Sequence, residues 1–164
     1  MTRAKGPAYN VQYRRRREGT TDFAKRLALI KSGKPRMVVR KSNKGLVVQF
    51  IEFDPKGDKT LLTVNGAILK KALKWESKRN VWTAYLAGLY AGKEAGKKGV
   101  KEFVFDMGRY TPSKGNILFA VVKGAADSGL KTNFSDKMVP SDKLANPPEA
   151  LKSAFEKAKS SIAG

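Results

Sequence analysis

The spacing of apolar residues predicts short helices and strands from residue 20 onward. Phe23, Leu27 and Ile30 recur at helical intervals after a Thr-Thr-Asp run that can cap a helix, and Gly33 and Pro35 follow as stop signals. Three runs rich in β-branched and aromatic residues come next, at 36–42, 46–53 and 59–65. They are joined by SNKG and DPKGD, which are short turn sequences. We therefore expect an antiparallel meander of three strands.

The second half of the chain predicts helices around one further strand. Helices are expected at 67–74, about 81–98 and 116–128, with a buried strand at 100–107. A meander followed by helix, strand and helix favours a parallel addition to the sheet. The predicted fold class is α/β, a mixed sheet of an antiparallel three-strand meander plus a parallel strand, packed by helices. Residues 131–146 have an irregular pattern, and a last amphipathic helix is expected over 147–162.

Two features of the long helix concern packing. Small residues recur at every fourth position: Ala84, Gly88, Gly92 and Gly96. Glycine weakens a helix interior by up to about 1 kcal/mol, so we interpret this row as close approach of the helix to the sheet, with approach to RNA as the alternative. Trp82 belongs to the apolar stripe and is expected in the core, whereas the pattern leaves the place of Trp75 open.

The chain divides into three parts by its pattern. Residues 1–19 lack apolar periodicity and are expected to form an extended basic arm. Residues 20–140 are expected to form the α/β globular domain. Residues 141–164 form a C-terminal tail with its amphipathic helix, which packs either on the body or on a neighbouring protein.

The charge of the chain points to a polyanionic partner. Lys and Arg number 34 against 14 Asp and Glu, a formal net charge of +20. The first fifty residues hold fourteen of the cations and only two acids, Glu18 and Asp22. Such a surface repels itself unless a polyanion neutralises it, so we expect nucleic acid rather than an anionic membrane.

The absence of Cys and His narrows the possible chemistry. The chain contains neither residue, which excludes disulfides, thiolate nucleophiles, histidine bases and Cys/His zinc sites. We expect no cofactor and no metal, and a reducing cytoplasm as the location. Neither a membrane-spanning run nor a signal peptide is expected from the hydropathy.

The strongest functional candidate is YRRRREG (13–19). Guanidinium groups match phosphate oxygens and stack on bases, and neighbouring tyrosine rings offer faces to unpaired bases. A solvated tail or a nuclear-import signal is the alternative for the arginine run alone. The run continues, however, into one cationic track. The expected RNA-binding residues of this track are Lys5, Tyr9, Tyr13, Arg14, Arg15, Arg16, Arg17, Lys25, Arg26, Lys31, Lys34, Arg36, Arg40, Lys41 and Lys44.

RNA is favoured over DNA as the partner. The sequence contains no helix-turn-helix, zinc finger or basic zipper to enter a major groove. Arg36 and Arg40 share one face of the first strand, so that face is expected to be basic while Met37 and Val39 face the other way. A basic arm beside a basic sheet face suits folded RNA.

A nuclease is the enzyme alternative. Acidic residues on or after the strands, namely Glu52, Asp54, Glu102 and Asp106, would have to meet around Mg²⁺. Isolated acids at strand ends are more often caps or ion-pair partners. TPSKGN (111–116) lacks the spacing of a phosphate loop, although Lys114 and Gly115 precede a helix and can meet an RNA phosphate. A general RNA chaperone is a further alternative.

Several segments, in order, resemble one family. YRRRREGTTDFAKRLALIKSGKPRMVVRKSNK, FDPKGDKTL, AYLAGLYAGKEAGKKGVKEFVFDMG and SKGNILFAVVKGAADSGL are similar to the 5S-rRNA-binding protein of the large ribosomal subunit, the universal eighteenth large-subunit protein, in its archaeal and eukaryotic style. The similarity runs from about residue 8 to 140. It departs at WESKRNVW, where the family commonly has a Gly/Ser/Thr-rich loop, and in a tail far shorter than the eukaryotic extension.

The resemblance implies a structural ribosomal protein, not an enzyme. It implies an α/β fold of the ribonuclease-H-like, translational-component type, without nuclease activity, on cytoplasmic ribosomes. The implied partners are 5S rRNA, the large-subunit (23S-type) rRNA and neighbouring large-subunit proteins, including a second 5S-binding protein, in the central protuberance; neither DNA nor membrane is implied. Motif matching carries over Tyr13, Arg14 to Arg17, Arg26, Lys34, Arg40, Lys41, Ser42, Asn43 and Lys44, and also Ser113, Lys114 and Gly115.

Overall fold

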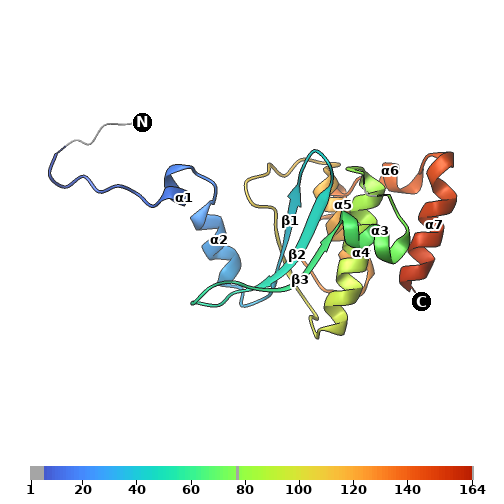
Figure 1. Cartoon of the computed structure of the whole chain (residues 1–164), viewed down its shortest axis with the longest axis horizontal. Helices are drawn as coiled ribbons and strands as arrows, with labels where there is room; N and C mark the ends of the chain where they lie inside the picture. Colours follow the sequence, from blue (N-terminus) through green and yellow to red (C-terminus); the bar gives the residue numbers. More distant parts are fainter. Residues whose placement is uncertain (1–5, 77, 164) are drawn as a thin grey trace.

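The sheet of this protein is flanked by helices that come mostly from the second half of the chain (Figure 1). The computed structural model describes residues 6–76 and 78–163. Its elements in chain order are α1 (Arg14–Arg17), α2 (Phe23–Ile30), β1 (Arg36–Lys41), β2 (Leu46–Glu52), β3 (Lys59–Asn65), α3 (Gly66–Leu73), α4 (Val81–Lys97), β4 (Val104–Asp106), α5 (Ile117–Asp127), η1 (Asp136–Met138), α6 (Ser141–Ala145) and α7 (Glu149–Ala163).

The four strands form one mixed sheet in the order β3-β2-β1-β4. β1 pairs with β2 and β2 with β3 in antiparallel fashion, whereas β4 lies parallel to β1, with Val38 opposite Asp106. The expected meander with a parallel addition is therefore confirmed. β4 is shorter than the expected strand over 100–107, because the backbone just before it bonds to residue 131: Phe103 N–H donates to Lys131 O and Lys131 N–H to Lys101 O, both at 3.0 Å.

The two faces of the sheet are covered differently. Strand alternation turns Met37, Val39, Val48 and Phe50 toward α4 and α5, where each is at most 1% exposed. The opposite face carries Arg36, Arg40 and Gln49, and the segment around α1 and α2 lies against it together with Asp58 of the β2–β3 loop and the loop after β4. The helices α4 and α5 do not cover this second face, and Arg40 is exposed on it, so we call it the open face of the sheet.

The glycines of α4 bring it against another helix, α5. A Cβ at Gly88 would lie 2.0 Å from the Val121 carbonyl oxygen, and one at Gly92 would lie 2.0 Å from Ser128 Oγ. The close approach expected from the glycine row is therefore real, but its partner is α5 and not the sheet. Gly96 has no atom within 4 Å of such a Cβ, so the contact ends before the row of glycines does.

The C-terminal helix packs on the body. Phe155, Ala158 and Ile162 of α7 are buried together with Trp75 and Tyr85, and the Phe155 ring lies 6.3 Å from that of Trp75. Residues 131–146, expected to be irregular, contain the short helices η1 and α6. In the described chain no helix is long and apolar enough to cross a bilayer.

The two tryptophans differ in burial, and the core position expected for Trp82 is not what the structure shows. Trp75 is buried, and its Nε1–H donates to Thr83 Oγ1 at 2.8 Å inside the core. Trp82, expected in the core, is half-buried and its Nε1–H donates to Lys143 O at 3.1 Å. Trp82 thus connects α4 to α6, because Lys143 is a residue of α6.

Candidate nucleic-acid interface

The arginine run forms a single helical turn within the basic arm. α1 spans Arg14–Arg17, with the Arg17 N–H bonded to Tyr13 O at 3.0 Å. The fully extended arm expected over 1–19 is therefore wrong at this point, because arginine is a good helix former and Gly19, at φ +58°, ends the turn. One turn points successive side chains in different directions around the backbone. Tyr13 is 89% exposed and all four guanidinium groups face solvent.

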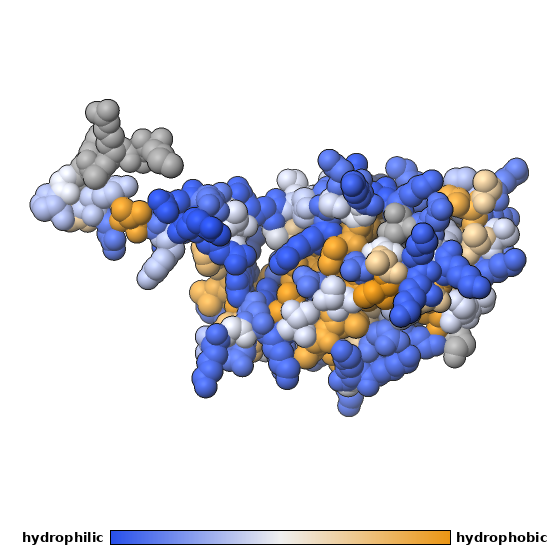
Figure 2. Space-filling model, viewed as in Figure 1, coloured by the Kyte–Doolittle hydropathy of each residue, from blue (hydrophilic) through white to orange (hydrophobic). Residues whose placement is uncertain are grey.

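Few acids neutralise this arm. Arg14 lies 3.6 Å from Glu18, but both side chains are exposed, and such a pair contributes little. Figure 2 shows hydrophilic side chains along the arm and at its junction with the body. Lys5 lies outside the described residues.

Side-chain hydrogen bonds fold the arm back toward the sheet. Arg15 Nε donates to Thr21 Oγ1 at 3.0 Å, and Thr20 Oγ1 donates to the Arg15 carbonyl at 3.2 Å. Arg109, in the loop after β4, donates from Nη1 to the Gly19 carbonyl oxygen. These bonds hold the junction between the arm and the body, at residues 15–21, in one position.

α2 starts at its expected cap. The Asp22 carboxylate accepts a hydrogen bond from the Lys25 N–H at 3.1 Å, and this bond, with the nearby Lys25 charge, holds the pKa of Asp22 below its usual value. The apolar residues expected on one face of this helix do not all become buried: Phe23 is 47% and Leu27 55% exposed. Figure 2 shows apolar atoms at the surface where Figure 1 places α2.

Arg36 is the clearest departure from the expected cationic track. It is only 4% exposed, and its guanidinium donates to Asp58 Oδ2 at 2.6 Å and to Asp106 Oδ2 at 2.8 Å. Arg26 of α2 donates to the same Asp58 oxygen at 2.7 Å. The expected phosphate-binding role of Arg36 does not fit this geometry, because its charge is already buried and paired. The group instead ties α2, β1, β4 and the β2–β3 loop together.

The other cations of the track differ in whether a carboxylate or an aromatic ring already contacts them. Lys34 pairs with Glu102 at 2.7 Å on the surface, and Lys25 with Asp22 at 3.6 Å. The Lys41 ammonium lies over the Tyr110 ring, 4.6 Å from its centre. The remaining cations are exposed and have no carboxylate partner among the described residues: Arg15, Arg16, Arg17, Lys31, Arg40 and Lys44.

The β1–β2 hairpin places its motif residues in two roles. The Ser42 hydroxyl accepts the Gly45 N–H at 3.2 Å, so it closes the turn. Asn43 and Lys44 stand exposed at the tip. Of the SNKG residues expected to bind RNA, these two are available to a partner, whereas Ser42 stabilises the turn.

The second motif, SKG, lies apart from the arm. Ser113 and Lys114 are exposed before α5, and Gly115, at φ +73°, donates its N–H to Met138 O at 3.0 Å. Asn116 caps α5 by accepting the Leu118 N–H at 3.2 Å. None of the three motif residues lines the hollow next to the arm.

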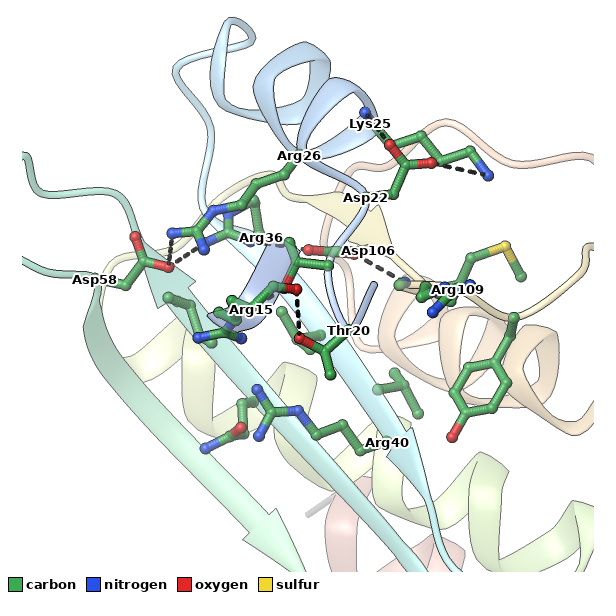
Figure 3. Close-up of a pocket in the computed structure, with 18 of the residues that line it drawn as sticks. Arg15, Thr20, Asp22, Lys25, Arg26, Arg36, Arg40, Asp58, Asp106 and Arg109 are labelled. Carbon is green, nitrogen blue, oxygen red and sulfur yellow. Dashed lines mark hydrogen bonds and ion pairs between the residues drawn. The ribbon is translucent and has the colours of Figure 1, made fainter. Parts of the chain in front are cut away.

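A hollow of about 760 Å³ lies between the arm, α2 and the open face of the sheet (Figure 3). Its cationic wall comes from four segments far apart in sequence: Arg15 before α2, Arg26 on α2, Arg40 on β1 and Arg109 after β4. Gln49 and Thr60 add neutral polar groups from β2 and β3. The arrangement presents guanidinium and amide donors together, which suits an anion or a nucleotide.

Sequence reasoning missed Gln49, Asp58 and Arg109. The alternation of β2 contained a signal for Gln49, because it is the polar position between inward-facing Val48 and Phe50. Arg109 reaches a residue 90 positions away, and no local pattern announces such a contact.

The acids expected for a nuclease do not converge. Asp106 binds Arg36, Glu102 binds Lys34, and Asp54 accepts the Lys56 N–H in a turn at 2.9 Å. In the part of the chain that the structure describes, no three His, Cys, Asp or Glu side chains are placed to hold a metal ion. Asp106 and Glu102 thus serve as ion-pair partners, and Asp54 stabilises a turn.

Comparison with known proteins yields one family. Residues 7–103 match the family described as "Ribosomal large subunit proteins 60S L5, and 50S L18". The chain is 45% identical over 139 residues to "Large ribosomal subunit protein uL18" of Aeropyrum pernix, covering 84% of this chain and 65% of that protein. It is 44% identical over 142 residues to the protein of the same name from Saccharolobus solfataricus, covering 86% and 71%. The chain thus spans about two thirds of the length of these relatives.

Proposed function

The chain belongs to this family of large-subunit ribosomal proteins, and from that premise we propose that it binds 5S rRNA and helps attach it to the large-subunit rRNA in the central protuberance. The relatives are named as ribosomal proteins, which are structural constituents rather than enzymes. The family resemblance also supports assigning the α/β fold to the ribonuclease-H-like, translational-component type.

One observation carries the proposal. Six exposed cations of the predicted track have no carboxylate partner among the described residues, and they lie on the arm, just after α2, on the outer face of β1 and on the β1–β2 hairpin: Arg15, Arg16, Arg17, Lys31, Arg40 and Lys44. A folded protein with a net charge of +20 gains most from a polyanion that lies along such a surface, because each neutralised phosphate releases condensed counterions.

The shape of this surface supports folded RNA as the partner. A single helical turn on an arm and an open sheet face do not form a recognition helix for a DNA major groove. They present exposed cations and two exposed rings, Tyr9 and Tyr13, which suits loops and irregular helices of RNA. A second 5S-binding protein and the large-subunit rRNA are the further proposed partners, on cytoplasmic ribosomes.

Competition binding tests the proposal. Labelled 5S rRNA is bound to the protein and challenged with unlabelled 5S rRNA or with an unrelated folded RNA of equal length, at several salt concentrations. Preference for 5S rRNA should persist as salt rises, since non-specific binding is lost first. Equal competition by both RNAs at moderate salt would instead indicate a general RNA chaperone and would refute the proposed partner.

A further inference from the structure

The hollow beside the arm has surfaces of three chemical kinds. Val38 of β1 and Ile51 of β2 form an apolar part, and both are less than 10% exposed. Gln49 supplies a carboxamide from the same face of the sheet. Arg15 supplies a cation from the arm and Arg40 supplies one from β1 (Figure 3). A simple phosphate site would need only the last of these surfaces.

The carboxamide of Gln49 is held in place. Its Nε2 donates to Thr63 Oγ1 on the neighbouring strand at 3.2 Å, so the side chain is oriented by the sheet and not by solvent. No described residue donates to its Oε1. A fixed amide beside an apolar surface offers one acceptor and one further N–H donor in a plane. This is the complement of the edge of a nucleic-acid base.

The wall of the hollow also contains an unpaired buried donor. Arg36 lines the hollow with its side chain only 5% exposed, and both its terminal nitrogens are bonded to carboxylates. Its Nε is buried and has no acceptor among the described residues. Buried donors in native proteins are almost always satisfied. The Nε of Arg36 is itself enclosed by the protein, so Arg36 serves as part of the wall through its two carboxylate pairs.

The cations at the edge are available for a phosphate. Arg40 is exposed and has no carboxylate partner in the described chain. Arg15 uses only its Nε for Thr21, which leaves its terminal nitrogens to bind elsewhere. The hollow, at about 760 Å³, falls within the range of sites for small ligands.

We propose that this hollow takes a single unpaired nucleotide of the bound RNA. The ring lies against Val38 and Ile51, the base edge meets Gln49, and the phosphate lies between Arg15 and Arg40. The nucleotide must be unpaired, because a duplex keeps its base edges inside and its deep groove closed to side chains. This inference rests on the proposed function. It adds a place where the protein recognises a base of the RNA, whereas the cationic surface contacts only its phosphates.

The test separates base contact from charge contact. Gln49→Leu removes the amide but no charge, so 5S rRNA affinity should fall about tenfold with the log–log salt slope unchanged. Arg40→Ala should lower both the affinity and the slope, the slope by about 0.7–0.9. Asn146→Leu, which removes an exposed amide far from the hollow, serves as the matched control and should bind as the wild type does.

Chemical probing of 5S rRNA gives a second measurement that does not depend on affinity. The wild-type protein should protect an unpaired base that becomes reactive in the Gln49→Leu complex, while the other protections remain. Gln49→Glu keeps the side-chain shape if the leucine variant fails to fold, and its carboxylate should weaken binding further by repelling the phosphate. Urea unfolding checks that each variant is folded.

Two results would overturn the inference. The first is a folded Gln49→Leu protein that binds 5S rRNA as tightly as the wild type and protects the same bases. The second is that Gln49→Leu weakens the binding of free AMP, GMP, CMP or UMP but leaves RNA binding unchanged. The hollow would then be a small-molecule site. In both cases the preference for 5S rRNA over unrelated RNA would still stand, so failure here is distinct from failure of the proposed function.

Discussion

Arg36 and Asp106 lie on neighbouring parallel strands, and Arg36 Nη1 donates to Asp106 Oδ2 at 2.8 Å. The two residues are 70 positions apart in sequence. The same guanidinium binds Asp58 at 2.6 Å, so one buried charge connects β1, β4 and the β2–β3 loop. Arg26 joins the cluster from α2 and extends it to the base of the arm.

Arg36→Ala is expected to destabilise the fold strongly. It leaves Asp106 without its cation and Asp58 with Arg26 alone, and removing one partner of a buried pair costs about 3 kcal/mol or more. Urea unfolding measures the loss. The matched control is Arg40→Ala on the same strand, where the side chain is exposed and the change should stay within about 0.5 kcal/mol. Equal effects of the two substitutions would show that the buried cluster contributes little.

Replacing Arg14 to Arg17 by alanine should reduce the salt dependence of 5S rRNA binding. Each lost phosphate contact lowers the log–log slope by about 0.7–0.9, so four contacts lower it by roughly 3. Titrations at several salt concentrations give the slope. Four exposed lysines elsewhere provide a control of equal charge: Lys71, Lys101, Lys152 and Lys157. If both fourfold variants lost the same slope, net charge and not the arm would govern binding.

Alanine substitution is expected to change stability in opposite directions at two glycines of α4, Gly88 and Gly96. Gly88→Ala places a methyl group against the Val121 carbonyl and should destabilise the protein by about 1–3 kcal/mol, because backbone atoms of α4 and α5 must separate. Gly96→Ala meets no neighbour and should stabilise it by up to about 1 kcal/mol. Thermal unfolding of the two variants checks the signs. A neutral Gly88→Ala protein would contradict the close contact between these helices.

Tyr85→Phe should change stability in a way that depends on pH. Burial of the Tyr85 hydroxyl, together with its 2.9 Å bond to Asp127, raises its pKa above the usual 10.0. A raised pKa means that the protonated hydroxyl stabilises the fold fully below about pH 10 and that this stabilisation is lost as the pH rises toward the folded pKa.

Unfolding in urea at about pH 7 and about pH 11 measures this effect. At the lower pH the free energy of unfolding of the wild type should be about 1 kcal/mol larger than that of the Tyr85→Phe variant. This difference should shrink at the higher pH. Lysine titration affects both proteins alike and cancels in the difference. A difference that stays constant between the two pH values would show that the hydroxyl is not perturbed.

Much of the fold could be predicted because the signals are local. Four helices begin at a polar residue whose side chain accepts a backbone N–H of the first turn, which is the usual helix cap. These residues are Asp22, Asn65, Asn80 and Asn116. Strand alternation and short turns were enough for the meander, and the order of helix and strand was enough for the parallel addition. The errors fall where packing decides: β4 is shortened by Lys131, and Trp75 rather than Trp82 is buried.

The candidate site was predictable only in its charge. The first third of the chain is visibly rich in cations, and Arg14 to Arg17, Arg40 and Lys44 are exposed as expected. Arg36 was grouped with them because it has the same strand parity as Arg40. Parity selects the face of a strand but does not tell whether a loop carrying Asp58 will cover that face.

By itself the sequence determined the order and kind of the elements, the supply of positive charge and its concentration near the amino terminus, since helix caps, periodicity and net charge depend on neighbours along the chain. Only the tertiary structure decided which cations remain free for a partner. Ion pairs over 22 and 70 residues hold Arg36 in its buried place, and the hollow beside it is assembled from the arm, α2, residues of all four strands and the loop after β4. Coulomb attraction and burial act through space, so their outcome follows from the fold and cannot be read along the chain.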